Sequence, residues 1–179
     1  MIAEAAAFAE RAHRGVFRKG SRIPYIVHPM ETAVIVSGFT NDEEMIAAAL
    51  LHDVVEDAGV TGEELKAQFG QRVMELVLAE SEDKSKSWKE RKAYTLAHLR
   101  TSCRDEKILA LGDKLSNMRS TARDYLLLGD EVWTRFNEKD KTQHAWYYWG
   151  VADSLEELKE HFYYAEYHQL CKQVFGFYR

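Results

Sequence analysis

The sequence contains few cysteines and no long apolar run. Only Cys103 and Cys171 are present among the 179 residues, so the chain has no disulfide framework, which is typical of proteins kept in a reducing compartment. No stretch approaches the roughly 20 consecutive apolar residues that a membrane-spanning helix needs. The Ala-rich start is interrupted by Glu4, Glu10 and Arg11, which favours an amphipathic helix over a signal peptide. These absences predict a cytoplasmic protein with no membrane partner.

Basic residues are outnumbered by acidic ones. The 24 Lys and Arg residues against 29 Asp and Glu residues give a formal net charge of −5, which argues against binding to nucleic acid in general. The distribution is uneven, because no acidic residue occurs between Glu10 and Glu31. Such a segment is either a solvated basic loop or a site for an anionic ligand. Its cations are Arg11, Arg14, Arg18, Lys19 and Arg22.

No alternating strand pattern of useful length, internal repeat or linker is present, so the chain is predicted to be all-α. The hydrophobic fraction of 46% can supply one core. We expect a single domain over residues 1–179, with C-terminal helices at 138–174 packed on a motif-bearing core at about 11–124. Asp42 is an expected helix cap, and Thr61 and Ser154 each precede a Glu by three residues, as in a capping box. The expected helices span about 2–14, 29–38, 42–56, 61–78, 88–100, 105–124, 138–152 and 155–174, with Phe69-Gly70 interrupting the fourth and a polar loop at 81–87.

One imidazole and three carboxylates fall within six consecutive residues, as His52, Asp53, Glu56 and Asp57. At about 100° per residue, the three carboxylates share one face of a continuous helix, and His52 lies at the edge of that face. Charge placed beside the preceding apolar run is costly unless a cation compensates for it. A solvated acidic helix end explains the carboxylates but not the histidine. The pattern therefore favours a metal site.

A second histidine and a further aspartate can complete such a site. His28 precedes Pro29, which suits the first turn of a helix and leaves His28 at the helix start. Asp113 and Asn117 share a face one turn apart on an expected helix. Taken singly, such a histidine is more often a cap or core residue, and such an aspartate a solvated one. Two imidazoles with two carboxylates suit one divalent ion among Mn, Fe, Co and Zn, and the carboxylates favour Mn²⁺. The apolar stripe of the second helix comprises Ile108, Leu111, Leu115 and Met118.

Several motifs, in their order along the chain, resemble the HD hydrolase domain of RelA/SpoT homologues, enzymes that cleave the alarmone (p)ppGpp. The resemblance runs from the N-terminus to about Asp124, and nothing beyond it resembles a synthetase or regulatory domain. Residues 82–84 and 90–92 also resemble the single-domain metazoan type. The chain is therefore similar to a stand-alone small alarmone hydrolase. The motifs that carry the resemblance are Arg18-Lys19, residues 24–29, residues 48–57, Phe69-Gly70 and residues 112–119.

The resemblance implies a helical HD-domain phosphohydrolase fold and metal-dependent hydrolysis of the 3′-pyrophosphate of (p)ppGpp. The products would be pyrophosphate and GDP or GTP. The divalent metal, with Mn²⁺ favoured, would lower the pKa of a bound water, so that hydroxide becomes available near neutral pH. A guanine nucleotide is the implied partner, and the basic segment that ends at His28 is placed to receive its phosphates. The implied residues are the metal ligands His28, His52, Asp53 and Asp113, the catalytic Glu56 and Asp57, and the substrate-binding Arg18, Lys19 and Asn117.

Ser116 stands where the long RelA/SpoT proteins usually carry His, which leaves the identity of the substrate open. The aromatic residues 146–149 are interpreted as core packing or a self-association surface and are not assigned to the site. An HD phosphohydrolase acting on another nucleotide, such as NADPH or a nucleoside phosphate, would share the metal set. A non-catalytic nucleotide sensor could use the same fold, but the complete ligand set favours an enzyme. The choice between ppGpp and pppGpp, the native metal, regulation and a homo-oligomeric state are not decided by the sequence.

Overall fold

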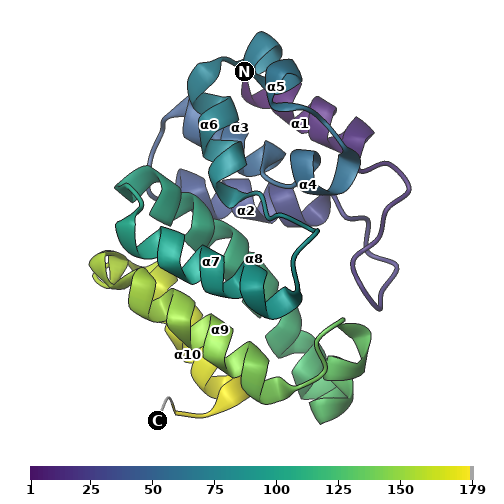
Figure 1. Ribbon diagram of the computed structural model, residues 1–179, viewed down its shortest axis with the longest axis vertical. Coiled ribbons are helices and arrows are strands. Elements are labelled where there is room, and N and C mark those ends of the chain that lie inside the picture. Colours follow the sequence, from purple (N-terminus) through teal and green to yellow (C-terminus); the bar gives the residue numbers. More distant parts are fainter. Residues whose placement is uncertain (178–179) are drawn as a thin grey trace. The chain divides into compact units, whose positions relative to one another are not determined.

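The computed structural model describes residues 1–177, which group into two compact units (Figure 1). The first unit comprises residues 1–82 and 103–113, and the second comprises residues 83–102 and the chain from residue 114 onward. The expectation of a single domain stays a prediction. No helix in the described part of the chain is long and apolar enough to cross a membrane.

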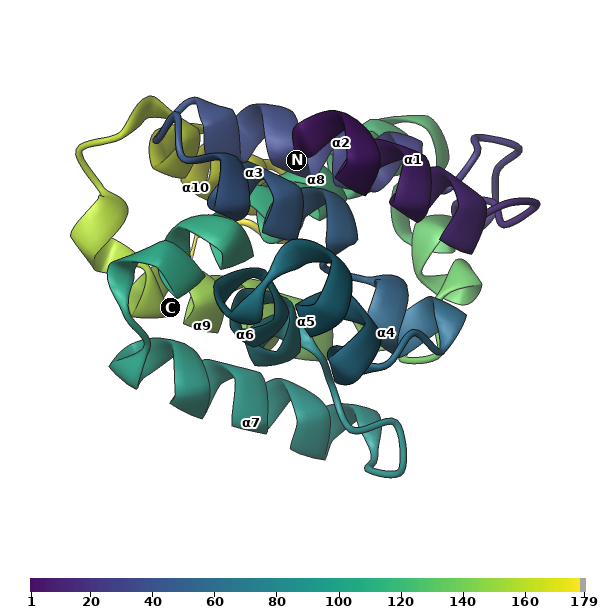
Figure 2. The ribbon, with the colours of Figure 1, turned by 90° about the horizontal axis from the view of Figure 1, so that it is seen from above.

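Helix α3 forms the centre of the first unit. It packs against α1, α2 and α6, and Figure 2 shows α1 and α2 beside it. Residues 47–51 of α3 are at most 4% exposed, and three of them are alanines, which allow neighbouring helices to approach closely. Arg72 links the N-terminus of α3 to α8 through ion pairs of 2.7 Å with Asp42 and 2.8 Å with Asp105. The elements of this unit are α1 Ile2–Ala12, α2 Val27–Ser37, α3 Glu43–Leu51, α4 Val54–Ala58, α5 Gly62–Phe69, α6 Gln71–Glu80 and the beginning of α8 Arg104–Leu128.

Helix α9 forms the centre of the second unit, where it contacts α7 and α10. Gly150 makes the contact with α7 close, because a Cβ at this position would lie only 2.7 Å from a methyl carbon of Leu96. Tyr147 and Trp149 are 3% and 5% exposed, which agrees with the core-packing interpretation of the aromatic stretch. The elements of this unit are α7 Trp88–Thr101, the rest of α8, the 3-10 helix η1 Gly129–Arg135, α9 Lys141–Ser154, the 3-10 helix η2 Glu156–Leu158 and α10 Phe162–Phe175.

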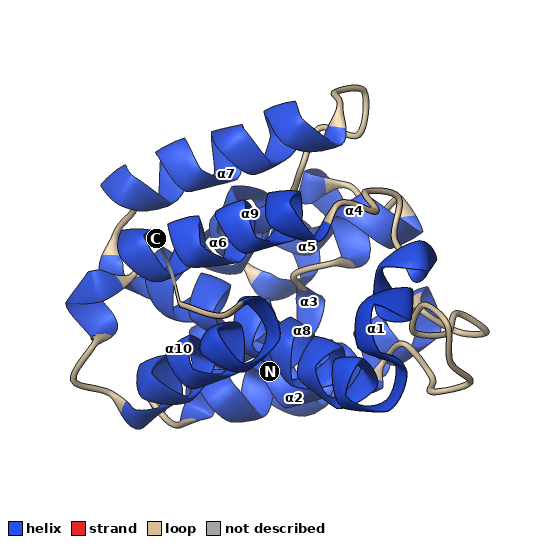
Figure 3. Ribbon diagram, turned by 90° about the horizontal axis from the view of Figure 1, so that it is seen from below, coloured by secondary structure: helices blue, strands red, loops and turns tan. Residues whose placement is uncertain are grey.

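The all-α prediction is confirmed. Figure 3 shows helices and loops, and the only strand-like feature within residues 1–177 is one isolated bridge between Phe17 and Pro24. Asp42 caps α3 by accepting the backbone N–H groups of Glu44 and Met45. The capping box of Thr61 and Glu64 is also present, at the start of α5. Both sequence signals therefore act where they were expected.

Several helix boundaries and caps differ from the prediction. The expected helix 42–56 ends at Leu51, and a separate α4 begins at Val54. Helix α2 begins at Val27 instead of Pro29, so His28 lies inside its first turn. Ser154 does not cap the last helix, because its hydroxyl donates to the carbonyl oxygen of Gly150 at 2.8 Å within α9. The cap of α10 is instead the ring of His161, and η1 was not predicted at all.

Candidate metal site

The break between α3 and α4 positions His52. Its ring is 2% exposed, and its Nδ1 lies 2.8 Å from the carbonyl oxygen of Ala49. Carbonyl groups in the last turn of a helix have no intrahelical partner, so this oxygen is available to the side chain. Because a carbonyl can only accept, Nδ1 carries the hydrogen. The Nε2 atom is then left as the lone-pair donor, which is the arrangement that metal-binding histidines need.

A close approach of α8 to α2 positions the other histidine and the distant aspartate. His28 lies in the first turn of α2 and Asp113 lies on α8, and both are buried. Between them the helices nearly touch. A Cβ at Gly112 would be 3.0 Å from a methyl carbon of Val36 and 3.3 Å from the backbone oxygen of Thr32. The glycine therefore allows α8 to bring Asp113 next to His28.

The four side chains expected to bind metal converge. The two Nε2 atoms of His28 and His52 are 3.2 Å apart, and Asp113 Oδ1 lies 3.1 Å from the first and 3.7 Å from the second. Asp53 Oδ2 lies 3.1 Å from His52 Nε2 and 3.5 Å from His28 Nε2. Ligand atoms about 2.1 Å from one ion lie about 3.0 Å apart as neighbours in an octahedron and about 3.4 Å apart in a tetrahedron. The spacing and the donor set of nitrogen and oxygen therefore fit a single divalent ion.

The electrostatics of the cluster show why a cation is favourable there. Burial opposes protonation of His52, but Asp53 and Asp113 outweigh it and raise the pKa of the imidazole well above its usual value. Burial likewise opposes ionisation of Asp53, but His52 and His28 outweigh it and hold the pKa of that carboxyl well below its usual range. The carboxylates thus attract positive charge, which a proton or a divalent cation can supply.

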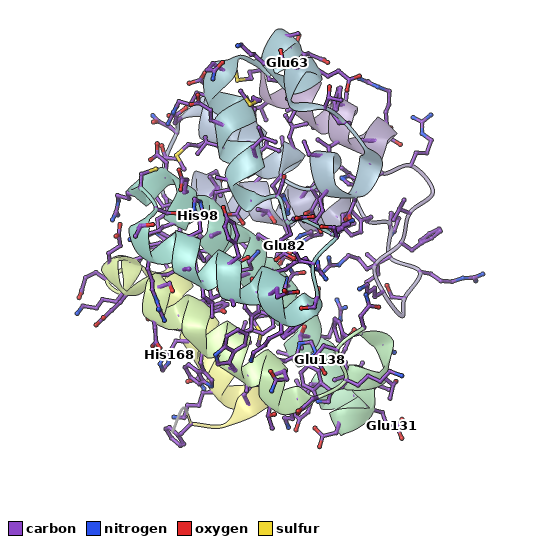
Figure 4. All side chains as sticks on the ribbon, in the orientation of Figure 1. Glu63, Glu82, His98, Glu131, Glu138 and His168 are labelled. Atoms are coloured by element: carbon purple, nitrogen blue, oxygen red, sulfur yellow. The ribbon has the colours of Figure 1, made fainter. Side chains whose placement is uncertain are left out.

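Helix α4 presents the two expected catalytic carboxylates. Asp57 is exposed, Glu56 is half-buried, and the N–H of Asp57 donates to the carbonyl oxygen of Asp53 at 2.9 Å. Glu56 Oε2 accepts the backbone N–H of Glu82 at 3.3 Å. Glu82 lies in the loop that follows α6 (Figure 4). Burial raises the pKa of Glu56, and the charges of Glu82, Asp53 and Asp57 raise it further.

Arg11 lies in the last turn of α1. The other basic residues of the segment lie on the loop between α1 and α2, which extends away from the helices of its own unit (Figures 1 and 2). The backbone N–H of Arg18 donates to the carbonyl oxygen of Ile23 at 2.9 Å, which closes the loop. The Arg18 guanidinium lies 5.6 Å from the centre of the Tyr25 ring. Lys19 is exposed on the same loop. Arg18 therefore contacts Tyr25, which lies next to the expected metal ligands, whereas Lys19 does not.

Asn117 lies four residues after Asp113 on α8, one helical turn further along, and is half-buried. It belongs to the second compact unit, whereas the other eight predicted site residues belong to the first. Its proposed contact with substrate stays a prediction.

The sequence analysis missed two residues beside the cluster, Tyr25 and His13. The hydroxyl of Tyr25 donates to Asp53 Oδ2 at 2.6 Å. The ring of His13 is buried and lies 4.8 Å from that of Tyr25. A signal for Tyr25 exists in the sequence, because it belongs to the motif of residues 24–29 that ends just after His28. His13 has no comparable signal.

Comparison with known proteins agrees with this fold. The family model of the HD domain matches residues 5–140. The chain belongs to the HD-domain family. The predicted resemblance to alarmone hydrolases is confirmed by the individual relatives.

Two of these relatives are named guanosine-3′,5′-bis(diphosphate) 3′-pyrophosphohydrolase MESH1. The protein from Xenopus tropicalis is 40% identical over 126 residues, which cover 69% of this chain and 70% of the relative. The human protein is 40% identical over 126 residues, with 68% and 70% covered.

Two solved structures are also similar. A protein from Listeria monocytogenes is 36% identical with a TM-score of 0.76, covering 83% of this chain and 98% of the other. A second structure, described as a metazoan orthologue of SpoT that hydrolyses ppGpp, is 27% identical with a TM-score of 0.81, covering 98% and 96%.

Proposed function

We propose that this protein hydrolyses the 3′-pyrophosphate of guanosine-3′,5′-bis(diphosphate) and releases GDP and pyrophosphate. The analogous pentaphosphate would give GTP. The observation that carries the proposal is the convergence of His28, His52, Asp53 and Asp113 at 3.1–3.7 Å beside the carboxylates of α4. The relatives that carry the name of this activity are 40% identical to the chain and support the choice of substrate.

The proposed cofactor is one divalent ion, held by the two histidines and the two aspartates. Among the ions that accept mixed nitrogen and oxygen ligands, the carboxylates favour Mn²⁺. When bound, the ion supplies Lewis acidity, which lowers the pKa of water and stabilises negative charge on a phosphoryl oxygen. The tautomer of His52, fixed by the carbonyl oxygen of Ala49, keeps its Nε2 atom available for this purpose.

Glu56 is the proposed base. A carboxylate acts well as a base when its pKa approaches the working pH, and burial with neighbouring negative charge raises the pKa of Glu56 in that direction. The backbone N–H of Glu82 donates to Oε2 of this carboxylate and helps to fix its orientation. The carboxylate is proposed to orient the attacking water or take its proton. Asp57, one residue further on the same helix, is proposed to assist in orienting that water.

Recognition of the nucleotide is assigned to the basic loop and to α8. Arg18 offers a planar cation that can stack on a base or pair with phosphate, and Lys19 offers a mobile point charge. Asn117 is proposed to contact the sugar or orient the nucleotide. The proposed compartment is the cytoplasm, where the free thiols of Cys103 and Cys171 would stay reduced.

The test is to incubate the metal-stripped protein with ppGpp, with and without Mn²⁺, and to follow GDP and pyrophosphate. NADPH is the parallel substrate, because the same metal set would serve another nucleotide phosphohydrolase. The proposal predicts Mn²⁺-dependent formation of both products at a rate well above NADPH dephosphorylation. Folded, Mn²⁺-loaded protein that leaves ppGpp intact would contradict it, and turnover of NADPH would then identify the alternative substrate.

A further inference from the structure

Tyr25 contacts both the metal site and the basic loop. Its hydroxyl donates to the carboxylate of Asp53, and the guanidinium of Arg18 lies over its ring. We propose that Tyr25 is a positioning residue that fixes the carboxylate of Asp53 through its hydroxyl and the guanidinium of Arg18 through its ring. The effect on Asp53 concerns metal affinity and can be measured without substrate. The effect on Arg18 rests on the proposed function.

Asp53 needs an external partner to hold its side chain. It lies in the break between α3 and α4, at the N-cap of α4, yet its carboxylate makes no capping hydrogen bond. Its Oδ2 atom instead accepts the Tyr25 hydroxyl at 2.6 Å and faces His52 Nε2 at 3.1 Å. A hydrogen bond of this kind fixes the orientation of a ligating carboxylate, and such outer partners strongly affect metal affinity. The hydroxyl of Tyr25 thus fixes the orientation of the Asp53 carboxylate.

The Tyr25 ring is itself held on several sides. Its backbone N–H donates to the carbonyl oxygen of Val16 at 2.9 Å, and its own carbonyl oxygen accepts the N–H of His28 at 2.9 Å. The buried ring of His13 packs against it with centroids 4.8 Å apart. These contacts attach Tyr25 to the end of α1 and the start of α2, so its hydroxyl has a defined direction. The side chain can therefore act as a rigid support.

The face of the same ring supports Arg18. The guanidinium lies 5.6 Å from the ring centre, within the range of a cation–π contact. Arg18 is on an extended loop, and without a support its long side chain would lose more conformational freedom on binding a nucleotide. One aromatic residue therefore orients a metal ligand and a substrate-binding cation together. The two effects separate chemically, because phenylalanine keeps the ring and removes the hydroxyl, whereas leucine removes both.

The test compares Tyr25→Phe and Tyr25→Leu with the wild type. The Kd for Mn²⁺ is measured by titration calorimetry on metal-stripped protein, and KM and kcat for ppGpp are measured at saturating Mn²⁺. Tyr25→Phe is expected to raise the Kd about 10- to 100-fold with KM within about twofold of the wild type, because the ring under Arg18 is kept. Tyr25→Leu is expected to raise the Kd similarly and to raise KM as well.

Tyr94→Phe is the matched control, since the Tyr94 side chain is 70% exposed, and it should leave the Kd, KM and Tm unchanged. A Tyr25→Phe protein with the wild-type Kd overturns the assignment to Asp53, even if its Tm falls, because a merely structural hydroxyl would lower stability alone. An unchanged KM in Tyr25→Leu overturns the assignment to Arg18. A wild type that binds Mn²⁺ but leaves ppGpp intact would contradict the proposed function without touching the effect of Tyr25→Phe on the Kd.

Discussion

His52 in the first unit and His144 in the second are both buried, at 2% and 5% exposed, yet the residues around them differ completely. The Nε2 atom of His52 faces Asp53 at 3.1 Å and Asp113 at 3.7 Å. The ring of His144 instead stacks on Trp133 with centroids 4.9 Å apart. The same side chain is therefore part of a charged cluster in one unit and of an aromatic core in the other.

The difference appears in their proton affinities. Burial lowers the pKa of His144, and its Nε2 is satisfied by the carbonyl oxygen of Glu138 at 2.9 Å, in the loop before α9 (Figure 4). At His52 burial acts in the same direction, but the two carboxylates reverse the outcome and raise the pKa. Burial alone thus makes a histidine a neutral packing group. Only the addition of anionic neighbours makes it part of a cation site.

The largest effect is expected from removing a member of the charged cluster. His52→Ala or Asp53→Ala should abolish Mn²⁺ binding and ppGpp hydrolysis together, because each removes one of the four proposed metal ligands. The matched control is His144→Ala, which should lower the free energy of unfolding by about 1–3 kcal/mol but keep the Kd for Mn²⁺. Metal binding by calorimetry and turnover are measured on all three variants. A His52→Ala protein that still binds Mn²⁺ with the wild-type Kd would remove His52 from the site.

A smaller effect is expected at the proposed base. Glu56→Gln keeps the size of the side chain and its hydrogen bond to Glu82 but loses the carboxylate, so it should reduce kcat by about 10²- to 10³-fold. The Kd for Mn²⁺ should stay near the wild-type value, in contrast to the loss expected for His52→Ala. Both constants are measured on the same preparation. Unchanged turnover would exclude Glu56 from the reaction.

Lowering the pH should weaken the binding of Mn²⁺ at His52. A metal binds the neutral imidazole, and His52 has a raised pKa, so its proton begins to compete above the ordinary histidine range near pH 6.5. Below that raised pKa the affinity for Mn²⁺ should fall by up to about tenfold per pH unit. Calorimetry from about pH 8.5 to about pH 6, at fixed ionic strength, measures it. A Kd that stays constant over this range would show that His52 releases no proton on binding.

The smallest effect is expected at the edge of the site. Arg18→Ala should raise KM for ppGpp by up to about tenfold with kcat little changed, if its contact is made equally in the ground and transition states. The Kd for Mn²⁺ should not change, because the Arg18 guanidinium lies against the ring of Tyr25, which is not one of the proposed metal ligands. Steady-state kinetics at saturating Mn²⁺ measure KM and kcat separately. An unchanged KM would remove Arg18 from the substrate contacts.

Much of this arrangement was predictable from the sequence. The 3.6-residue periodicity predicted the helices, and the histidines and aspartates were recognisable as one ligand set because their chemistry matches a divalent ion. The break between α3 and α4 was not, since no Gly or Pro interrupts the run from Leu50 to Val55. Contacts from outside the segment, such as that of Asp53 with Tyr25, accompany the break. Such tertiary contacts leave no periodic signal in the sequence.

The wrong capping prediction has a similar physical cause. A serine three residues before a glutamate marks a capping box only if the serine is the last residue before a helix. Ser154 instead lies in the final turn of α9, where its hydroxyl donates to the carbonyl oxygen of Gly150. Serine makes both kinds of hydrogen bond readily, so the short pattern does not distinguish the start of a helix from its end. The helical register of the preceding segment decides between them.

The most direct test of the account is a titration of Mn²⁺ into the metal-stripped protein, in which bound metal and the rate of ppGpp hydrolysis are followed together. If His28, His52, Asp53 and Asp113 hold one catalytic ion, activity should rise in proportion to bound Mn²⁺ and reach its maximum at one equivalent per chain. Full activity of the stripped protein, or Mn²⁺ bound at one equivalent with no hydrolysis of ppGpp, would contradict the account.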